Sequence, residues 1–70
     1  MAEVRAEMVA NVWKVVVSEG DHVADGDTLV ILESMKMEIP VLAEESGTVT
    51  KMHVAEGDVV QEDELIAEIG

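Results

Sequence analysis

The sequence predicts an all-β protein made of two related halves, and three observations support this fold class. Valine and other β-forming residues alternate with polar residues, and no segment keeps the 3.6-residue spacing of an amphipathic helix. These short runs are separated by acidic turns that contain glycine. The third observation is an internal repeat. Together they predict a flattened barrel or sandwich of two four-stranded antiparallel sheets with quasi-two-fold symmetry and almost no helix.

The repeat is found by shifting the chain by 37 positions, which aligns residues 4–23 with 41–60 at ten identities in twenty. After residue 23, one deletion aligns residues 27–30 with 63–66. We therefore interpret residues 1–70 as a single domain of two repeats, about 4–33 and 41–69, joined by a hairpin at 34–38. A repeat of roughly 35 residues cannot bury its own apolar face, so the two must share one core.

Each repeat is expected to contain four strands. The strands that open the repeats are predicted at residues 3–8 and 37–43, short runs at 21–23 and 58–60, and the closing strands around 29–31 and 65–69. In the second strand of the first repeat, simple alternation places Val12, Lys14 and Val16 on one face and Trp13, Val15 and Val17 on the other. The matching strand alternates in the same way. Its two sets are Val49, Lys51 and His53, and Thr50, Met52 and Val54.

Charge and composition exclude several classes of function. Sixteen acidic residues against four basic ones give a net charge of −12, which repels phosphate backbones and anionic lipid surfaces. We therefore expect no nucleic-acid and no membrane partner, and the short apolar runs indicate neither a spanning segment nor a signal peptide. The absence of cysteine excludes disulfides and thiolate zinc sites. A cytoplasmic monomer is expected, and the initial Met1 favours a free-standing protein over a trimmed domain.

No catalytic or metal-binding constellation is visible in the sequence. His22 and His53 do not occupy equivalent repeat positions and lack further ligands at suitable spacing, so we predict no metal site. An enzyme would need a nucleophile–base pair or a perturbed pair of acids in a pocket, and the core is too small to enclose one. An acidic protein-interaction module stays open as a class that needs no such constellation.

The junction between the repeats is the most informative segment. Residues 31–39 are strand-like on both sides and offer no Gly, Asn or Asp for a comfortable two-residue turn. With Met35 and Lys36 at the tip, Lys36 becomes the accessible lysine of the chain and is flanked by Met35 and Met37. Methionine adapts well to binding surfaces, which favours recognition of this tip by another protein.

The junction resembles the biotinylation sequence of the biotinyl/lipoyl-attachment domain family, with Met35-Lys36-Met37 as the most diagnostic part. The framework on both sides also matches the family's pattern. The matching segments are Gly20-Asp21-x-Val23-x-x-Gly26-Asp27-x-Leu29, Val41-x-Ala43-x-x-x-Gly47-x-Val49 and Gly57-Asp58-x-Val60. Ser34 stands where alanine is usual, Ala10-Asn11 replaces an expected glycine turn, and the protruding thumb of some bacterial carriers is missing. The missing thumb leaves open which carboxylase the domain serves.

The resemblance implies a non-catalytic carrier that holds biotin covalently on Lys36. A biotin protein ligase would attach the cofactor, and a biotin carboxylase and a carboxyltransferase would be the further partners. Met35 and Met37 would then be recognised by the ligase, with Glu33 and Gly20 as further recognition residues.

The alternative within the same family is a lipoyl carrier of a 2-oxo-acid dehydrogenase or glycine-cleavage system. Glu33 and Gly20 lie three and sixteen residues before Lys36, positions that lipoyl domains also use, so a lipoyl ligase is a further candidate partner and lipoate a further candidate cofactor. Met-Lys-Met favours biotin, since lipoyl domains usually carry Asp-Lys-Ala.

Overall fold

The computed structural model describes residues 2–70, and within this range it contains eight strands and no helix. The strands are β1 (Ala2–Arg5), β2 (Ala10–Val15), β3 (His22–Val23), β4 (Thr28–Ser34), β5 (Met37–Leu42), β6 (Gly47–Met52), β7 (Val59–Val60) and β8 (Leu65–Ile69). No helix of the described residues has the length and hydrophobicity needed to cross a membrane.

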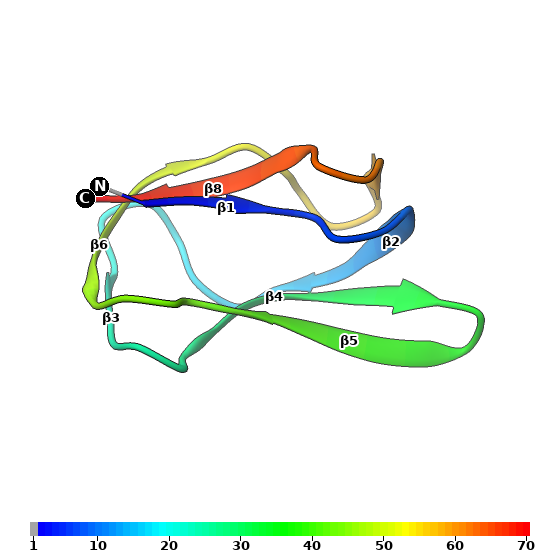
Figure 1. Ribbon diagram of the computed structural model, residues 1–70, viewed down its shortest axis with the longest axis horizontal. Coiled ribbons are helices and arrows are strands. Elements are labelled where there is room, and N and C mark those ends of the chain that lie inside the picture. Colours follow the sequence, from blue (N-terminus) through cyan, green and yellow to red (C-terminus); the bar gives the residue numbers. More distant parts are fainter. Residues whose placement is uncertain (1) are drawn as a thin grey trace.

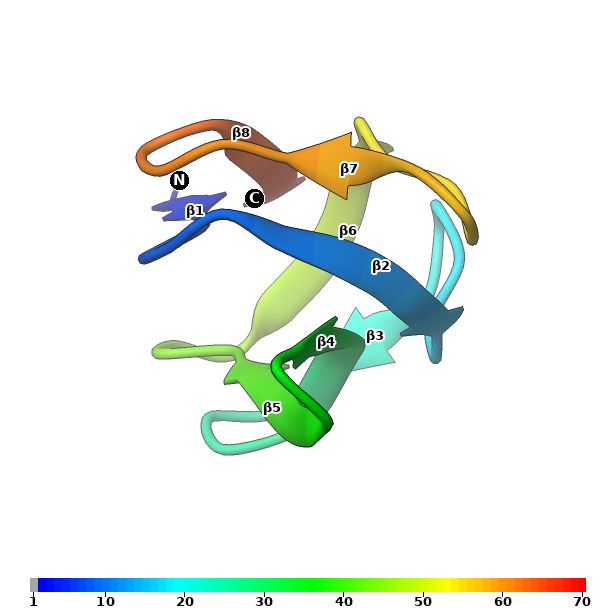
Figure 2. The ribbon, with the colours of Figure 1, turned by 90° about the vertical axis from the view of Figure 1, so that its right-hand side faces the viewer.

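The strands form two four-stranded antiparallel sheets, in the orders β1-β8-β6-β3 and β5-β4-β2-β7 (Figures 1 and 2). We call the second the hairpin sheet, because it contains the β4–β5 hairpin, and the first the opposite sheet. The molecule is 31 Å long and 17 Å across in the other two directions. The predicted flattened barrel-sandwich of two four-stranded sheets is confirmed.

The quasi-two-fold symmetry extends to individual hydrogen bonds. Gly20 donates its N–H to the carbonyl of Val49, and 37 residues later Gly57 donates to the carbonyl of Val12. Both glycines have φ of 94°, a left-handed conformation that glycine adopts without a steric penalty. The acidic turn of each half is therefore hydrogen-bonded to the long strand of the other half.

The deletion expected after residue 23 is wrong, because the offset of 37 continues to the end of the chain. Gly26 donates to the carbonyl of Ala43 in the first half, and Asp63 donates to that of Ala6 in the second. Asp63 has φ of 70° where Gly26 has 93°, so an aspartate adopts the left-handed turn that a glycine makes in the first half. The structural repeat is thus unbroken, and the sequences diverge because this corner is made by different residue types.

The simple alternation expected for the two long strands is also wrong, since each contains a β-bulge. The register of β2 against β4 shifts between Val12 and Lys14, and that of β6 against β8 shifts between Val49 and Lys51. The extra residue reverses the phase of the alternation, so Val12 is buried while Lys14 and Val16 are exposed.

Turn carboxylates accept hydrogen bonds from backbone N–H groups of the two long strands, beyond the residues that pair with the short strands β7 and β3. The Glu56 carboxylate accepts a hydrogen bond from the N–H of Val15 at 3.2 Å. At the equivalent positions of the repeat, the Glu19 carboxylate accepts one from the N–H of Met52 at 2.9 Å. Part of the acidic composition is therefore structural, because an unsatisfied backbone N–H would cost free energy.

The strand that opens the first repeat is shorter than expected, ending at Arg5 rather than residue 8. Ala6 is 3% exposed and exchanges backbone hydrogen bonds with the corner at Asp63 and Glu64. The chain thus turns into the core here and cannot continue along β8. The second repeat does the same at Ala43, so β5 ends one residue before the expected limit.

The core consists of aliphatic side chains supplied by both halves. Two clusters of buried residues are related by the repeat, so that Val12 in one corresponds to Val49 in the other, and Ile66 to Leu29. Each cluster takes buried residues from both repeats, so neither repeat has a core of its own.

We predict that Val12→Ala and Val49→Ala each reduce the free energy of unfolding by about 1–3 kcal/mol, because each removes two buried methyl groups from an equivalent position. Val16→Ala is the control, since Val16 is 53% exposed. Urea denaturation of the three variants measures the losses. Unfolding free energies of the two core variants within error of the wild type would contradict the shared core.

Candidate functional site

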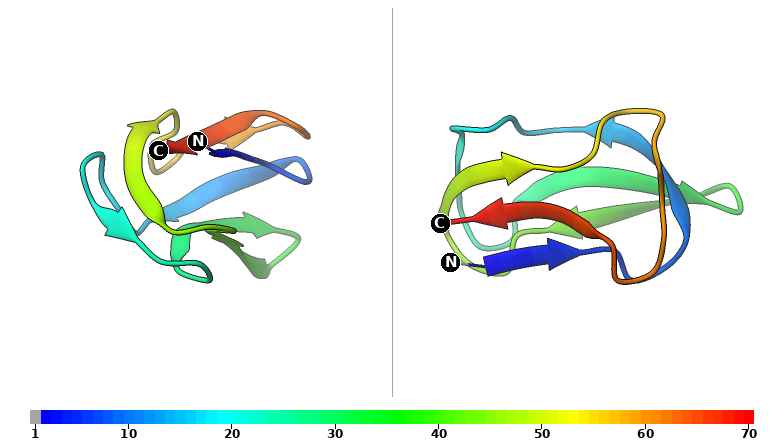
Figure 3. Two further views of the ribbon diagram at one scale, coloured as in Figure 1. Left: turned by 60° about the vertical axis from the view of Figure 1, so that its left-hand side comes forward. Right: turned by 90° about the horizontal axis from the view of Figure 1, so that it is seen from above.

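The candidate site is the tip of the β4–β5 hairpin, the end of the molecule that projects furthest from the two sheets (Figures 1 and 3). The pairing of β4 with β2 begins at Glu33, whereas its pairing with β5 continues to Ser34 opposite Met37. Residues 34–37 therefore extend beyond the end of β2 as a two-stranded arm, with Met35 and Lys36 at the two central positions of the turn.

Both central residues of this turn have positive φ, 51° for Met35 and 66° for Lys36. These are the signs of a type I′ turn, whose twist matches that of antiparallel strands but which strongly prefers Asn-Gly. A left-handed conformation costs a residue with a Cβ atom roughly 1–2 kcal/mol. The hairpin thus keeps an unfavourable sequence in a tight turn, and such strain is typical of functional sites.

The side chains at the tip are free to meet another molecule. Met35 is 92% exposed and Met37 is 61% exposed, and Lys36 is exposed between them. Among the hydrogen bonds and ion pairs of residues 2–70, none involves the Lys36 ammonium group. The arrangement presents one primary amine, flanked by two apolar side chains, on a two-stranded arm.

Acidic side chains mark the base of the arm. Glu33 and Glu38 are exposed and face each other directly across β4 and β5. Like charges in this position repel, so the pair does not contribute to hairpin stability. It gives the arm a negative base below the cationic Lys36.

The structure does not bring Gly20 to this site. The turn that precedes β3 lies at the end of the molecule where the two termini lie, and the hairpin projects from the other end (Figure 3). Gly20 has a positive φ, which gives it a structural role in the turn before β3. A contribution of Gly20 to ligase recognition stays a prediction.

Residues that the sequence did not single out lie beside the arm instead. Asn11 of β2 pairs with Glu33 on one side and with Val59 of β7 on the other. The resulting row across the hairpin sheet runs from Val59 through Asn11 and Glu33 to Glu38. This row is made by strand pairing, and no residue type in the sequence marks it.

Elsewhere the described part of the chain offers a groove but no metal-binding cluster. The groove runs along the seam between the edge strands β1 and β5 and includes neither Met35 nor Lys36. Among residues 2–70, no three His, Asp or Glu side chains converge in a way that would hold a metal ion.

Comparisons with known proteins agree on the family. The model of the family described as "Biotin-requiring enzyme" matches residues 2–69. The biotinylated protein TB7.3 homolog of Mycobacterium leprae is 64% identical over 70 residues, which are 99% of each chain. The biotin/lipoyl attachment protein of Bacillus subtilis is 46% identical over 66 residues, covering 94% of this chain and 90% of that protein.

Solved structures with the same fold come from two kinds of enzyme system, a carboxylase and a dehydrogenase complex. A segment of the Kluyveromyces lactis urea carboxylase superposes with a TM-score of 0.92 at 39% identity, over 99% of this chain and 6% of that one. The lipoyl domain of the Azotobacter vinelandii 2-oxoglutarate dehydrogenase complex gives 0.85 at 24% identity, over 100% of this chain and 96% of that domain. The backbone alone therefore does not distinguish the two kinds.

We predict that Met35→Asn combined with Lys36→Gly raises the free energy of unfolding by about 1–2 kcal/mol, because Asn-Gly fits the two positive φ values without steric strain. Thermal and urea unfolding of the variant against wild type provide the measurement. A loss of stability would show that the turn is not strained by its present residues.

Proposed function

Because the chain belongs to the family of biotin/lipoyl attachment domains, we propose that it is a biotin carboxyl carrier and that Lys36 is the residue to which biotin is attached. The observation that carries this proposal is the exposed, unpartnered amine of Lys36 at the tip of a strained hairpin. A close relative described as a biotinylated protein supports the choice of cofactor.

The hairpin fits a covalently attached cofactor. An amine that forms an amide must be reachable by an enzyme and must lose its charge, and no ion pair within residues 2–70 has to be broken at Lys36. A biotin protein ligase joins the biotin carboxyl group to the AMP portion of ATP, and pyrophosphate leaves. The Lys36 amine then displaces the activating group, an amide bond forms, and AMP and a proton leave.

Biotin on this arm supplies a ureido nitrogen that carries a carboxyl group between a biotin carboxylase and a carboxyltransferase. The chain itself contributes position and reach. Residues 34–37 hold the attachment point beyond the sheets, so the arm can enter an active site that the body of the domain cannot enter. Tethering makes each delivery an intramolecular encounter, with effective concentrations on the order of millimolar for short flexible tethers.

Lipoate is the second candidate cofactor, because the family includes lipoyl attachment and a lipoyl domain shares the fold. The side chains that flank the amine favour biotin in our proposal. Met35 and Met37 present apolar surface, which fits an apolar ligase pocket, whereas lipoyl domains usually have an aspartate before the lysine.

We predict that Lys36→Arg abolishes the mass increase that corresponds to one biotin, while the free energy of unfolding stays within about 0.5 kcal/mol of wild type. The measurement is intact mass after incubation with a biotin protein ligase, ATP and biotin. Lys14→Arg is the matched control, because Lys14 is also an exposed lysine of the hairpin sheet. A biotin adduct that persists in the Lys36 variant would place the attachment elsewhere.

We also predict that Met35→Asp combined with Met37→Ala lowers the ratio of biotinylation to lipoylation at least about tenfold. A charged aspartate in an apolar ligase pocket costs roughly 2 kcal/mol if left unpaired, which exceeds the free energy of a tenfold ratio. Side-by-side assays with the two ligases give the ratio, with circular dichroism as the control for folding. An unchanged ratio would move cofactor choice away from the two flanking residues.

A further inference from the structure

The internal repeat makes each sheet a natural control for the other. The two-fold operation exchanges the hairpin sheet with the opposite sheet, so every outward position on one has an equivalent 37 residues away on the other. If both outer faces only met water, equivalent outward positions would carry similar residue types. The two outer faces match at some positions, such as Lys14 and Lys51, and differ at others.

At six pairs of equivalent outward positions, the hairpin sheet and its continuation carry an apolar residue where the opposite sheet carries a polar one. The pairs are Trp13 and Thr50, Val16 and His53, Ile31 and Glu68, Pro40 and Glu3, Leu42 and Arg5, and Val59 and His22. The apolar members come from both halves of the chain, so the difference follows the sheet and not the repeat. A general excess of apolar residues in one repeat cannot explain it.

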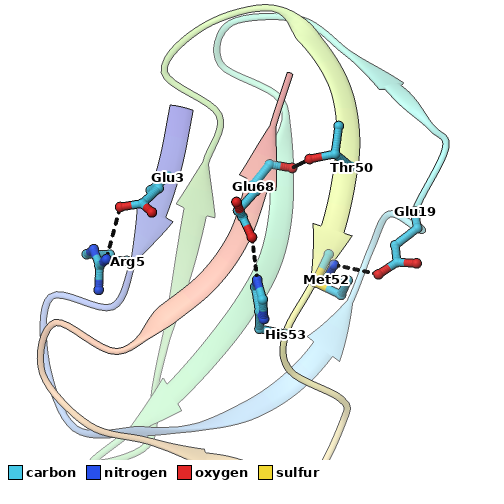
Figure 4. A network of polar contacts seen from close by, with 7 residues as sticks. All are labelled: Glu3, Arg5, Glu19, Thr50, Met52, His53 and Glu68. Carbon is cyan, nitrogen blue, oxygen red and sulfur yellow. Dashed lines mark hydrogen bonds and ion pairs between the residues drawn. The ribbon is translucent and has the colours of Figure 1, made fainter. Parts of the chain in front are cut away.

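The outer face of the opposite sheet is occupied by its own polar contacts (Figure 4). Arg5 forms an ion pair with Glu3 at 2.9 Å, and His53 contacts the Glu68 carboxylate at 2.8 Å. On the hairpin sheet, Trp13 is 42% exposed and Val59 is 56% exposed. Among the described residues, no large exposed apolar side chain belongs to a strand of the opposite sheet.

The apolar face adjoins the base of the arm that carries Lys36. Val59 pairs with Asn11, which pairs with Glu33 at the base of the arm, and Trp13 follows two residues further along β2. The Lys14 ammonium lies 5.3 Å from the centre of the Trp13 ring. A polar row of Asn11, Glu33 and Glu38 therefore separates the exposed apolar side chains of this face from the tip of the arm.

The charge of the chain disfavours a second copy as the occupant of this face. Two molecules of net charge −12 repel each other, and the face is bordered by Glu33 and Glu38. A partner with an apolar centre and a rim of Lys or Arg is complementary to it.

We propose that the outer face of the hairpin sheet, centred on Trp13 and Val59, is the docking surface for the biotin protein ligase. The proposal rests on the proposed attachment at Lys36. Before modification the reactive group is only one lysine side chain long, so the ligase must approach the body of the domain more closely than enzymes that use the longer loaded arm. The ligase surface beside the arm then lies against the row of Val59, Asn11 and Glu33. An enzyme that binds ATP also offers the cationic groups that Glu33 and Glu38 would attract.

The test exchanges residues between the two faces. The face variant Trp13→Thr with Val59→His introduces the residue types that the two-fold equivalent positions already hold, so the backbone is compatible with both. The control variant Thr50→Trp with His22→Val makes the reciprocal change on the opposite sheet. For a purified biotin protein ligase, we expect the KM of the face variant to rise at least about fivefold with kcat retained, because binding is weakened and Lys36 is untouched. The KM of the control variant should equal that of wild type.

An unchanged KM of the face variant overturns the proposal, as does an equal rise in the control variant. If the wild type itself accepts no biotin, the attachment at Lys36 fails instead, which separates the two proposals. An unchanged ligase KM with slower carboxylation of the loaded chain assigns the face to the carboxylase and overturns the ligase assignment.

Hydrogen exchange of the unaltered chain gives a readout that does not depend on the variants. With ligase present, slower exchange is expected in residues 10–15 and 59–60 and not in residues 47–52. Protection confined to residues 34–37 would overturn the proposal.

Discussion

The structure depends on one constraint: each half of the chain is too small to bury its own apolar face. The two halves solve this by exchanging contacts, so the turn of each is hydrogen-bonded to the long strand of the other, and the equivalent residues Val12 and Val49 lie in two related aliphatic clusters that each take residues from both halves. Because both halves contribute to each cluster, damage to either half exposes the other. The fold is therefore expected to unfold as a unit, as small single cores usually do.

Chain connectivity breaks this symmetry at one place, and the candidate site lies there. The two-fold equivalent of the hairpin tip is the end of the molecule where the termini lie, because β1 and β8 stand where β5 and β4 stand in the other sheet (Figure 1). Lys36 thus projects from the end furthest from any segment joined to the termini. The tip contributes little buried surface, so its sequence can serve recognition at small cost to the core.

The sequence predicted the strand content, the pseudo-symmetry and the position of Lys36, because these follow from valine alternation and from a repeat that can be counted. It did not predict the bulges after Val12 and Val49, since a bulge adds a residue without a distinctive residue type. It also misplaced the second half of the alignment, because Asp63 adopts the backbone conformation that Gly26 has in the first half. Both misses come from backbone conformation, which residue types encode only weakly.

The bulges link fold to function, because they determine which residues face outwards. With strict alternation, Lys14 would share a face with the buried Val12 and point inwards, while Trp13 and Val15 would point outwards. The bulge instead turns Lys14 outwards beside Trp13, where the ammonium group lies over the ring. The equivalent bulge in β6 turns Lys51 outwards beside Thr50. The same backbone device thus places a lysine beside an aromatic ring on the sheet that carries the arm and beside a hydroxyl on the sheet that does not. The two faces therefore differ through their side chains on a common backbone, which is how a duplicated framework acquires a single recognition surface.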